Sequence, residues 1–176
     1  MTRAARAVHM SDHDIRVLSS GLSQGDEMRH FTCLHGLVDT LDIWKRLVPD
    51  LETRGRVTRL DQRGHGQSGA PPGPYTRADL ASDVAAVLDA EGIDQTILVG
   101  HSMGGIVAME TALLYPDRIA GLVLIGTTSE CREKIADWYE RSPSPENATA
   151  PRAWVGRSME RNRPRRSRAT RRESRM

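Results

Sequence analysis

A serine flanked by glycines is the feature of this chain best suited to covalent chemistry. It lies in the pentapeptide Gly-His-Ser-Met-Gly at residues 100–104, between the apolar run 96–99 and a segment with helical spacing of apolar residues. A G-x-S-x-G sequence at such a junction predicts a sharp strand-to-helix turn that lifts the serine hydroxyl clear of a sheet. Gly100 and Gly104 are expected where the turn leaves no room for a Cβ atom. Ser102 is therefore the candidate nucleophile, with His101 beside it.

An acyl group transferred to this serine would pass through an intermediate whose negative oxygen needs hydrogen-bond donors. The amide of Met103 lies at the positive end of the helix expected after Ser102, which makes it one such donor. A second donor is expected from the amide of Leu37, because His35-Gly36-Leu37 follows an earlier apolar strand. Leu37 and Met103 together form the predicted oxyanion hole.

The segment 61–68 (Asp-Gln-Arg-Gly-His-Gly-Gln-Ser) raises a different hypothesis, because Gly64, Gly66 and the following Gly69 fit G-x-G-x-x-G after a strand. Dinucleotide binding requires a helix directly after those glycines, and the proline-rich run 70–74 prevents one. We expect instead that Asp61 and Arg63 fix the loop by charge-assisted hydrogen bonds. No nucleotide, metal or other cofactor is predicted.

The elements that must position these residues alternate along the chain. Their type and order follow from hydrophobic periodicity and from the placement of glycine and proline. The predicted strands span 14–20, 31–34, 56–61, 96–99 and 119–125, and the predicted helices span 41–48, 76–91, 102–115 and 130–141. A turn over 19–26 is expected to join two hairpin strands. Strands alternating with helices predict an α/β fold with a mostly parallel sheet and helices on both faces.

Composition is consistent with one domain of 176 residues. Two cysteines, Cys33 and Cys131, lack metal-ligand spacing and fit a reducing compartment. No apolar run approaches the length needed to span a membrane, so a cytoplasmic protein without membrane partners is expected. Three regions are predicted: a flexible leader over 1–13, the α/β domain over 14–141, and a disordered Arg/Pro-rich tail over 142–176.

The tail carries most of the positive charge. Ten arginines and two glutamates fall between residues 152 and 176, so the preceding part is net acidic although the whole chain carries +2. An arginine-rich segment could bind nucleic acid through phosphates. The tail lacks interleaved aromatic residues beyond Trp154, and no nucleic-acid-binding fold accompanies it, which disfavours this interpretation.

Three ordered motifs carry a resemblance to a known family. They are His35-Gly36, then Asp61-x-Arg63-Gly64-x-Gly66-x-Ser68, then Gly100-His101-Ser102-Met103-Gly104-Gly105. In this order and spacing they resemble the α/β-hydrolase family, closest to small bacterial esterases and enol-lactonases, over roughly residues 15–139. The resemblance implies an eight-stranded sheet, a lid after strand 119–125, and a nucleophile, an acid and a histidine in that chain order. It also implies hydrolysis of a small ester or lactone through an acyl-enzyme on Ser102.

The chain departs from the family pattern after strand 119–125. All six histidines precede Ser102, and the strands that would end at the triad acid and histidine are not apparent, although Glu130 stands where some members place the acid. The resemblance therefore implies a C-terminally truncated or frameshifted hydrolase. Three hypotheses remain: a serine hydrolase, a non-catalytic remnant that self-associates through the edge strand 119–125, and a binding module whose basic tail engages nucleic acid.

Overall fold

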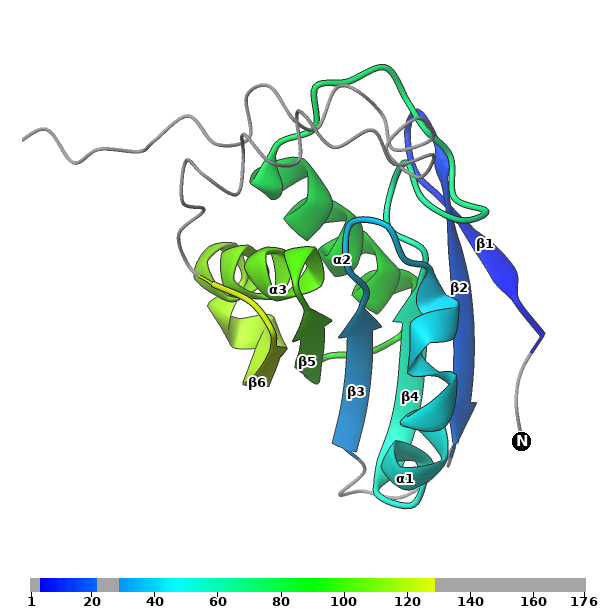
Figure 1. Cartoon of the computed structure of the whole chain (residues 1–176), viewed down its shortest axis with the longest axis vertical. Helices are drawn as coiled ribbons and strands as arrows, with labels where there is room; N and C mark the ends of the chain where they lie inside the picture. Colours follow the sequence, from blue (N-terminus) through cyan, green and yellow to red (C-terminus); the bar gives the residue numbers. More distant parts are fainter. Residues whose placement is uncertain (1–3, 22–28, 129–176) are drawn as a thin grey trace, which may run out of the picture.

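A single six-stranded sheet organises the part of the chain that the computed structural model describes, residues 4–21 and 29–128 (Figure 1). The strand order is β1-β2-β4-β3-β5-β6. Strands β3, β4, β5 and β6 run parallel, whereas β2 is antiparallel to both β1 and β4. The strands are β1 (Arg6–His9), β2 (Asp14–Gly21), β3 (Arg29–Leu34), β4 (Gly55–Leu60), β5 (Thr96–His101) and β6 (Ile119–Ile125). The mostly parallel sheet agrees with the sequence prediction.

Helices connect the parallel strands. They are the 3₁₀ helix η1 (Leu41–Arg46), α1 (Val48–Glu52), α2 (Arg77–Glu91), α3 (Met103–Leu114) and the 3₁₀ helix η2 (Pro116–Arg118). Helix α2 begins at a reciprocal capping box, in which Thr76 and Asp79 satisfy each other's backbone amides. It ends at Gly92, whose φ of 63° is the left-handed conformation that glycine adopts at low cost.

Both faces of the sheet are covered. Helices α2 and α3 pack on one face, and η1 with α1 packs on the other (Figure 1). Alternate residues of one strand serve the two cores: Leu98 of β5 joins the α2–α3 side, and Val99 joins the side of Trp44 and Val48. A strand buried on both faces reads as a continuous apolar run, as in the central strands of parallel sheets.

Two expectations about the N-terminal region are wrong. The leader predicted over 1–13 is not separate from the domain, because β1 lies within it and pairs with β2. The predicted hairpin does not form either: β2 pairs with β1 and β4, and β3 lies between β4 and β5. Alternation in sequence identified a strand at Asp14–Gly21 but carries no information about a partner distant in the chain.

The predicted helix over 41–48 is also corrected. The structure has η1 followed by a separate short helix α1, and Pro49 lies in the first turn of α1. Proline is tolerated there because the missing amide would have no partner within the helix. The helix expected at 130–141, the tail over 142–176 and the candidate acid Glu130 lie outside the described residues. Within the described ranges, no helix has the length and apolarity needed to cross a membrane.

Candidate active site

Ser102 lies at the turn between β5 and α3 with an unusual backbone conformation. Its φ is 51° and its ψ is −115°, and it is the one non-glycine residue with positive φ in the described part of the chain. Such a conformation costs on the order of 1–3 kcal/mol and persists only where the surroundings enforce it. Four hydrogen bonds hold it. The Ser102 amide donates to the Ile125 carbonyl (2.9 Å), and the Ser102 carbonyl accepts from the Thr127 hydroxyl (2.7 Å) and from the amides of Gly105 (3.0 Å) and Ile106 (3.4 Å).

Glycine is required on both sides of this turn because backbones meet there. A Cβ on Gly100 would lie 2.5 Å from the Gly104 carbonyl oxygen, and a Cβ on Gly104 would overlap the Leu34 carbonyl. Strand β3 and helix α3 therefore approach each other closely, and the segment after β3 lies directly beside the turn at Ser102. Close packing of main chains thus accounts for the two glycines of the sequence motif.

The Leu37 amide is the second predicted oxyanion donor. It lies in a segment whose peptide orientation is fixed by hydrogen bonds to the neighbouring carbonyl groups. Buried His35 donates through Nδ1 to the Gly36 carbonyl (2.7 Å), which also accepts from the Asp39 amide (3.2 Å). Because the Gly36–Leu37 peptide is trans, the Leu37 amide points away from those donors. His65 Nε2 faces the Leu37 carbonyl at 2.5 Å and so fixes the next peptide as well. Both peptides that flank the Leu37 backbone are therefore anchored.

His35 acts here as a neutral ring with a defined tautomer. Its Nε2 accepts from the Gln62 amide (3.0 Å), so Nδ1 carries the hydrogen that reaches Gly36. Burial lowers the pKa of His35 to about 4, and the hydrogen bond to the Gly36 carbonyl only partly offsets this effect. A ring with both nitrogens engaged by the backbone is a positioning group and is not free to serve as a base for Ser102.

Asp61 organises the loop that follows β4. Its carboxylate is fully buried and accepts from the Leu41 amide (2.7 Å), the Gln67 amide (3.0 Å) and the Arg16 guanidinium (3.3 Å). A Cβ on Gly66 would overlap that carboxylate. Asp61 therefore ties its loop to β2 and to the start of η1.

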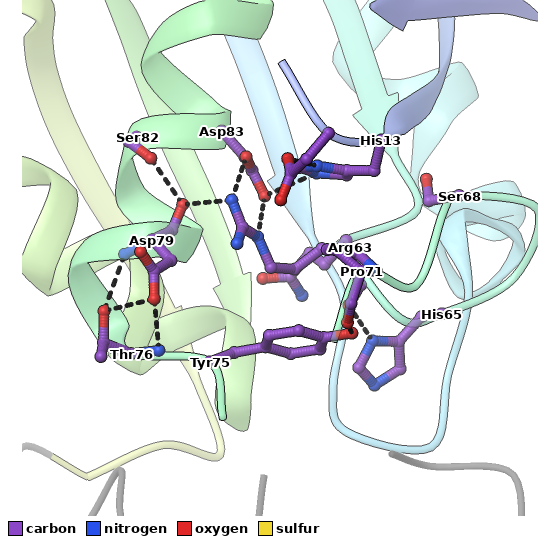
Figure 2. A network of polar contacts seen from close by, with 12 residues as sticks. His13, Arg63, His65, Ser68, Pro71, Tyr75, Thr76, Asp79, Ser82 and Asp83 are labelled. Atoms are coloured by element: carbon purple, nitrogen blue, oxygen red, sulfur yellow. Dashed lines mark hydrogen bonds and ion pairs between the residues drawn. The ribbon is translucent and has the colours of Figure 1, made fainter. Parts of the chain in front are cut away.

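Arg63 anchors the same loop to helix α2 (Figure 2). Its guanidinium makes a two-point contact with Asp83, at 2.6 and 2.7 Å, and lies 5.6 Å from the ring centre of Tyr75. The His13 side chain, 2% exposed, approaches Asp83 from the turn between β1 and β2, with Nε2 3.5 Å from the carboxylate. Asp83 and His13 were missed by the sequence analysis, although a carboxylate next to Val84 on the apolar stripe of the predicted helix was a signal.

His101, the residue before Ser102, faces the segment after β3. Its Nδ1 lies 3.7 Å from Asp39 Oδ2, and a Cβ on Gly36 would lie 3.1 Å from each of these two atoms. Within residues 4–21 and 29–128, no hydrogen bond or ion pair joins the Ser102 hydroxyl to a histidine or a carboxylate. The same ranges contain no group of three or more metal-ligating side chains.

A sharp strand-to-helix turn bearing a strained serine, at the carboxyl end of a parallel strand, is typical of α/β hydrolases. The sequence profile of the alpha/beta hydrolase fold matches residues 29–163. The chain therefore belongs to the α/β-hydrolase family, as the sequence motifs predicted.

Individual relatives share this half of the fold. The chain is 38% identical over 122 residues to a putative carbamate hydrolase RutD from Variovorax paradoxus, covering 68% of this chain and 46% of the relative. It is 38% identical over 118 residues to epoxide hydrolase B from Mycobacterium tuberculosis, covering 63% and 33% respectively. The crystal structure of the enol-lactonase from Burkholderia xenovorans LB400 superposes with a TM-score of 0.67 at 29% identity, covering 74% and 52%. The chain thus spans half or less of the length of the curated relatives it matches.

Proposed function

We propose that this chain carries the nucleophile and the oxyanion hole of a serine hydrolase that acts on a carboxylic ester or lactone. The strained Ser102 conformation is the observation that supports the proposal, because a positive φ on a serine is costly and persists only where the surroundings enforce it. In the first step Ser102 Oγ adds to the substrate carbonyl carbon. The resulting oxyanion accepts hydrogen bonds from the amides of Leu37 and Met103. The alcohol then departs, and water later releases the acid from Ser102.

The identity of the nucleophile favours acyl substrates over epoxides. A serine oxygen that opened an epoxide would form an ether, which water does not readily cleave, so the enzyme would be blocked after one event. A serine oxygen that attacks an ester, lactone or carbamate forms an acyl-enzyme that water can hydrolyse. Among the activities named for the relatives, lactone, ester and carbamate hydrolysis fit Ser102, and epoxide hydrolysis does not.

The proposal assigns no base within the described residues. Ser102 needs a group that takes its proton, but His35 has both ring nitrogens engaged, and both ring nitrogens of His65 face carbonyl oxygens. His101 faces Asp39 and Gly36. Acylation of Ser102 and full turnover are therefore separate questions, and the experiment must measure both.

The test uses p-nitrophenyl acetate with intact-mass spectrometry of the purified chain. We expect a burst of about one p-nitrophenol per chain and an acetyl group on the peptide that contains Ser102. Ser102→Ala should abolish both signals, and Ser82→Ala, which changes an exposed serine on α2, should leave them intact. Acylation without later release would show a competent nucleophile in a chain that lacks its base. Absence of the Ser102 adduct, or hydrolysis unaffected by Ser102→Ala, would overturn the proposal.

A further inference from the structure

The segments that follow β3 and β5 lie side by side at one edge of the sheet. Leu34 of β3 is opposite Gly100 of β5 in a parallel register, so both strands end at the same place (Figure 1). The segment after Leu34 contains Leu37, and the segment after Gly100 contains Met103. Each segment therefore carries one of the two amides proposed as oxyanion donors. The distance between these amides depends on the contacts that hold the two segments together.

A side-chain contact between His101 and Asp39 joins the two segments. His101 Nδ1 lies 3.7 Å from Asp39 Oδ2, which is within the range of an ion pair but too long for a hydrogen bond. The side chains of His101 and Asp39 are 35% and 32% exposed, but His101 Nδ1 itself is buried and makes no hydrogen bond within residues 4–21 and 29–128. A buried ring nitrogen without a hydrogen bond is unfavourable, and the Asp39 carboxylate is the charged group that faces it.

Gly36 leaves the space that this contact needs. A Cβ on Gly36 would lie 3.1 Å from His101 Nδ1 and 3.1 Å from Asp39 Oδ2, closer than ordinary van der Waals contact. Gly36 does not have a positive φ, so its backbone conformation does not require glycine. The absence of a side chain at Gly36 therefore matters because it lets His101 and Asp39 approach each other.

The backbone of Asp39 connects this contact to the Leu37 amide. The Asp39 amide donates to the Gly36 carbonyl (3.2 Å) and closes a turn in which Leu37 is the second residue. A displacement of the Asp39 side chain therefore moves one end of that turn. On the other side of the contact, His101 is bonded directly to Ser102, whose amide and carbonyl are both held by hydrogen bonds.

We propose that His101 and Asp39 are positioning residues, and that their contact sets the distance between the Leu37 amide and the turn at Ser102. This inference rests on the proposed function, because it concerns acylation of Ser102. Neither side chain exchanges a proton or touches the substrate in this role. Without the contact, the turn over 36–39 shifts while the fold remains, so attack on the substrate carbonyl slows and substrate binding does not weaken. Loss of a whole oxyanion donor costs about 10²–10³ in rate, so displacement of one should cost about tenfold.

The first experiment measures acylation of the full chain by p-nitrophenyl acetate in stopped-flow bursts. These bursts separate the acylation rate constant from the dissociation constant of the substrate. Asp39→Asn and His101→Gln should each lower the rate constant about tenfold and leave the dissociation constant unchanged. The double variant should be no slower than the slower single variant, because both changes remove the same contact. Multiplied losses in the double variant, or an effect on the dissociation constant alone, would overturn the proposal.

Asp42→Asn is the matched control for Asp39→Asn. Asp42 is close to Asp39 in sequence, its side chain is 48% exposed, and it pairs with Lys45 (3.2 Å) within η1. This variant should acylate as the wild type does. Wild-type acylation of Ser102 in both Asp39→Asn and His101→Gln would overturn the positioning proposal and leave the proposed function standing.

Amide hydrogen exchange, followed by NMR, tests the same contact without any reaction. In His101→Gln the Asp39 amide should exchange roughly two- to fivefold faster, the effect expected from loss of a partly exposed ion pair. The Leu41 amide, which donates to the buried Asp61 carboxylate (2.7 Å), should exchange at the wild-type rate. Unchanged exchange at Asp39 would overturn the positioning proposal even if Ser102 is never acylated, whereas a missing Ser102 adduct would overturn the proposed function.

Discussion

The two edges of the sheet are built by different physical means. At the β1 edge, a strand of only four residues is fixed by charge: Arg6 donates to the buried Glu91 carboxylate (2.7 Å) and His9 contacts Asp14 (2.7 Å). At the β6 edge, seven apolar residues stand without a charged partner. Charged side chains at an edge strand oppose pairing with a further strand. Within the described residues, charge therefore protects the β1 edge, whereas no charge protects β6.

The same division extends inward. On the β1 side, the loop after β4 and helix α2 are joined by buried carboxylates, with Glu91 and Asp83 each contacted by arginine. On the β6 side, the turn at Ser102 is fixed by main-chain contacts that only glycine permits. The stability that the buried ion pairs contribute should therefore depend on pH and on which partner is mutated. The packing at the Ser102 turn should be lost when a glycine there gains a single carbon atom.

The largest expected effect is on the β6 side. Gly104→Ala places a Cβ against the backbone carbonyl of Leu34, which cannot move aside. We expect a loss of about 4–5 kcal/mol or complete failure to fold, measured by urea unfolding. Gly121→Ala in β6 is the matched control, because its Cβ would meet only the Ile97 side chain at 3.8 Å. A Gly104→Ala chain as stable as the control would contradict the close packing of β3 and α3.

The next effect tests the charged side. Glu91→Gln removes the carboxylate contacted by Arg6 and Arg56 while its side chain is only 1% exposed. We expect a loss of about 3 kcal/mol, because the largely covered guanidinium of Arg56, 13% exposed, loses the negative charge that it pairs with. Asp89→Asn, which removes an ion pair at a side chain that is 67% exposed, should cost well under 1 kcal/mol. Similar losses in the two variants, measured by chemical unfolding, would show that the burial of Glu91 has little importance.

A pH-dependent effect is expected at the segment after β3. The pKa of His35 is lowered from 6.5 to about 4 in the folded chain. The unfolded chain then binds a proton that the folded chain does not, so stability is full above pH 6.5 and falls as the pH drops toward 4. The loss reaches roughly 3 kcal/mol at most. Thermal or urea unfolding of His35→Asn should show a correspondingly smaller loss over this range.

The smallest effect should appear at the start of α2, the helix that carries both acidic anchors of the β1 side. Thr76→Ala removes one half of its capping box. We expect a loss of about 1 kcal/mol, with the ion pairs of Asp83 and Glu91 intact. Ser82→Ala, in the same helix, removes only an exposed contact to the Asp79 carbonyl and serves as the control. A loss of several kcal/mol in the free energy of unfolding would mean that opening of the first turn of α2 also disrupts the ion pairs of Asp83 and Glu91.

Sequence predicted the local elements of this fold better than their partners. Helix α2 was predicted from an apolar stripe, a capping pair and Gly92, all of which act within a few residues. Strand β1 was missed because four residues in an arginine-containing segment have no periodicity to recognise, and its pairing with β2 depends on contacts formed by the whole domain. The sequence also predicted β3 as the neighbour of β2, whereas β4 lies there. The cause is the same, because the neighbour of a strand depends on contacts between distant segments.

For the candidate site, the motifs identified the residues but not the contacts that hold them in place. The turn at Ser102 and the loop held by Asp61 and Arg63 follow from glycine placement and charge. The clamp of His65 on the Leu37 carbonyl and the approach of His13 to Asp83 join segments from different strands. Such contacts become visible only when the sheet order is known.

The positive-φ backbone at Ser102 also bears on the history of this lineage. A glycine would occupy that conformation with less strain than serine, so stability alone gives no reason to keep a hydroxyl there. As long as the proposed reaction benefits the cell, selection opposes this relaxation. Once the benefit is gone, position 102 is where descendants gain stability from a single change, so its identity in related genomes would report whether the chemistry is still in use.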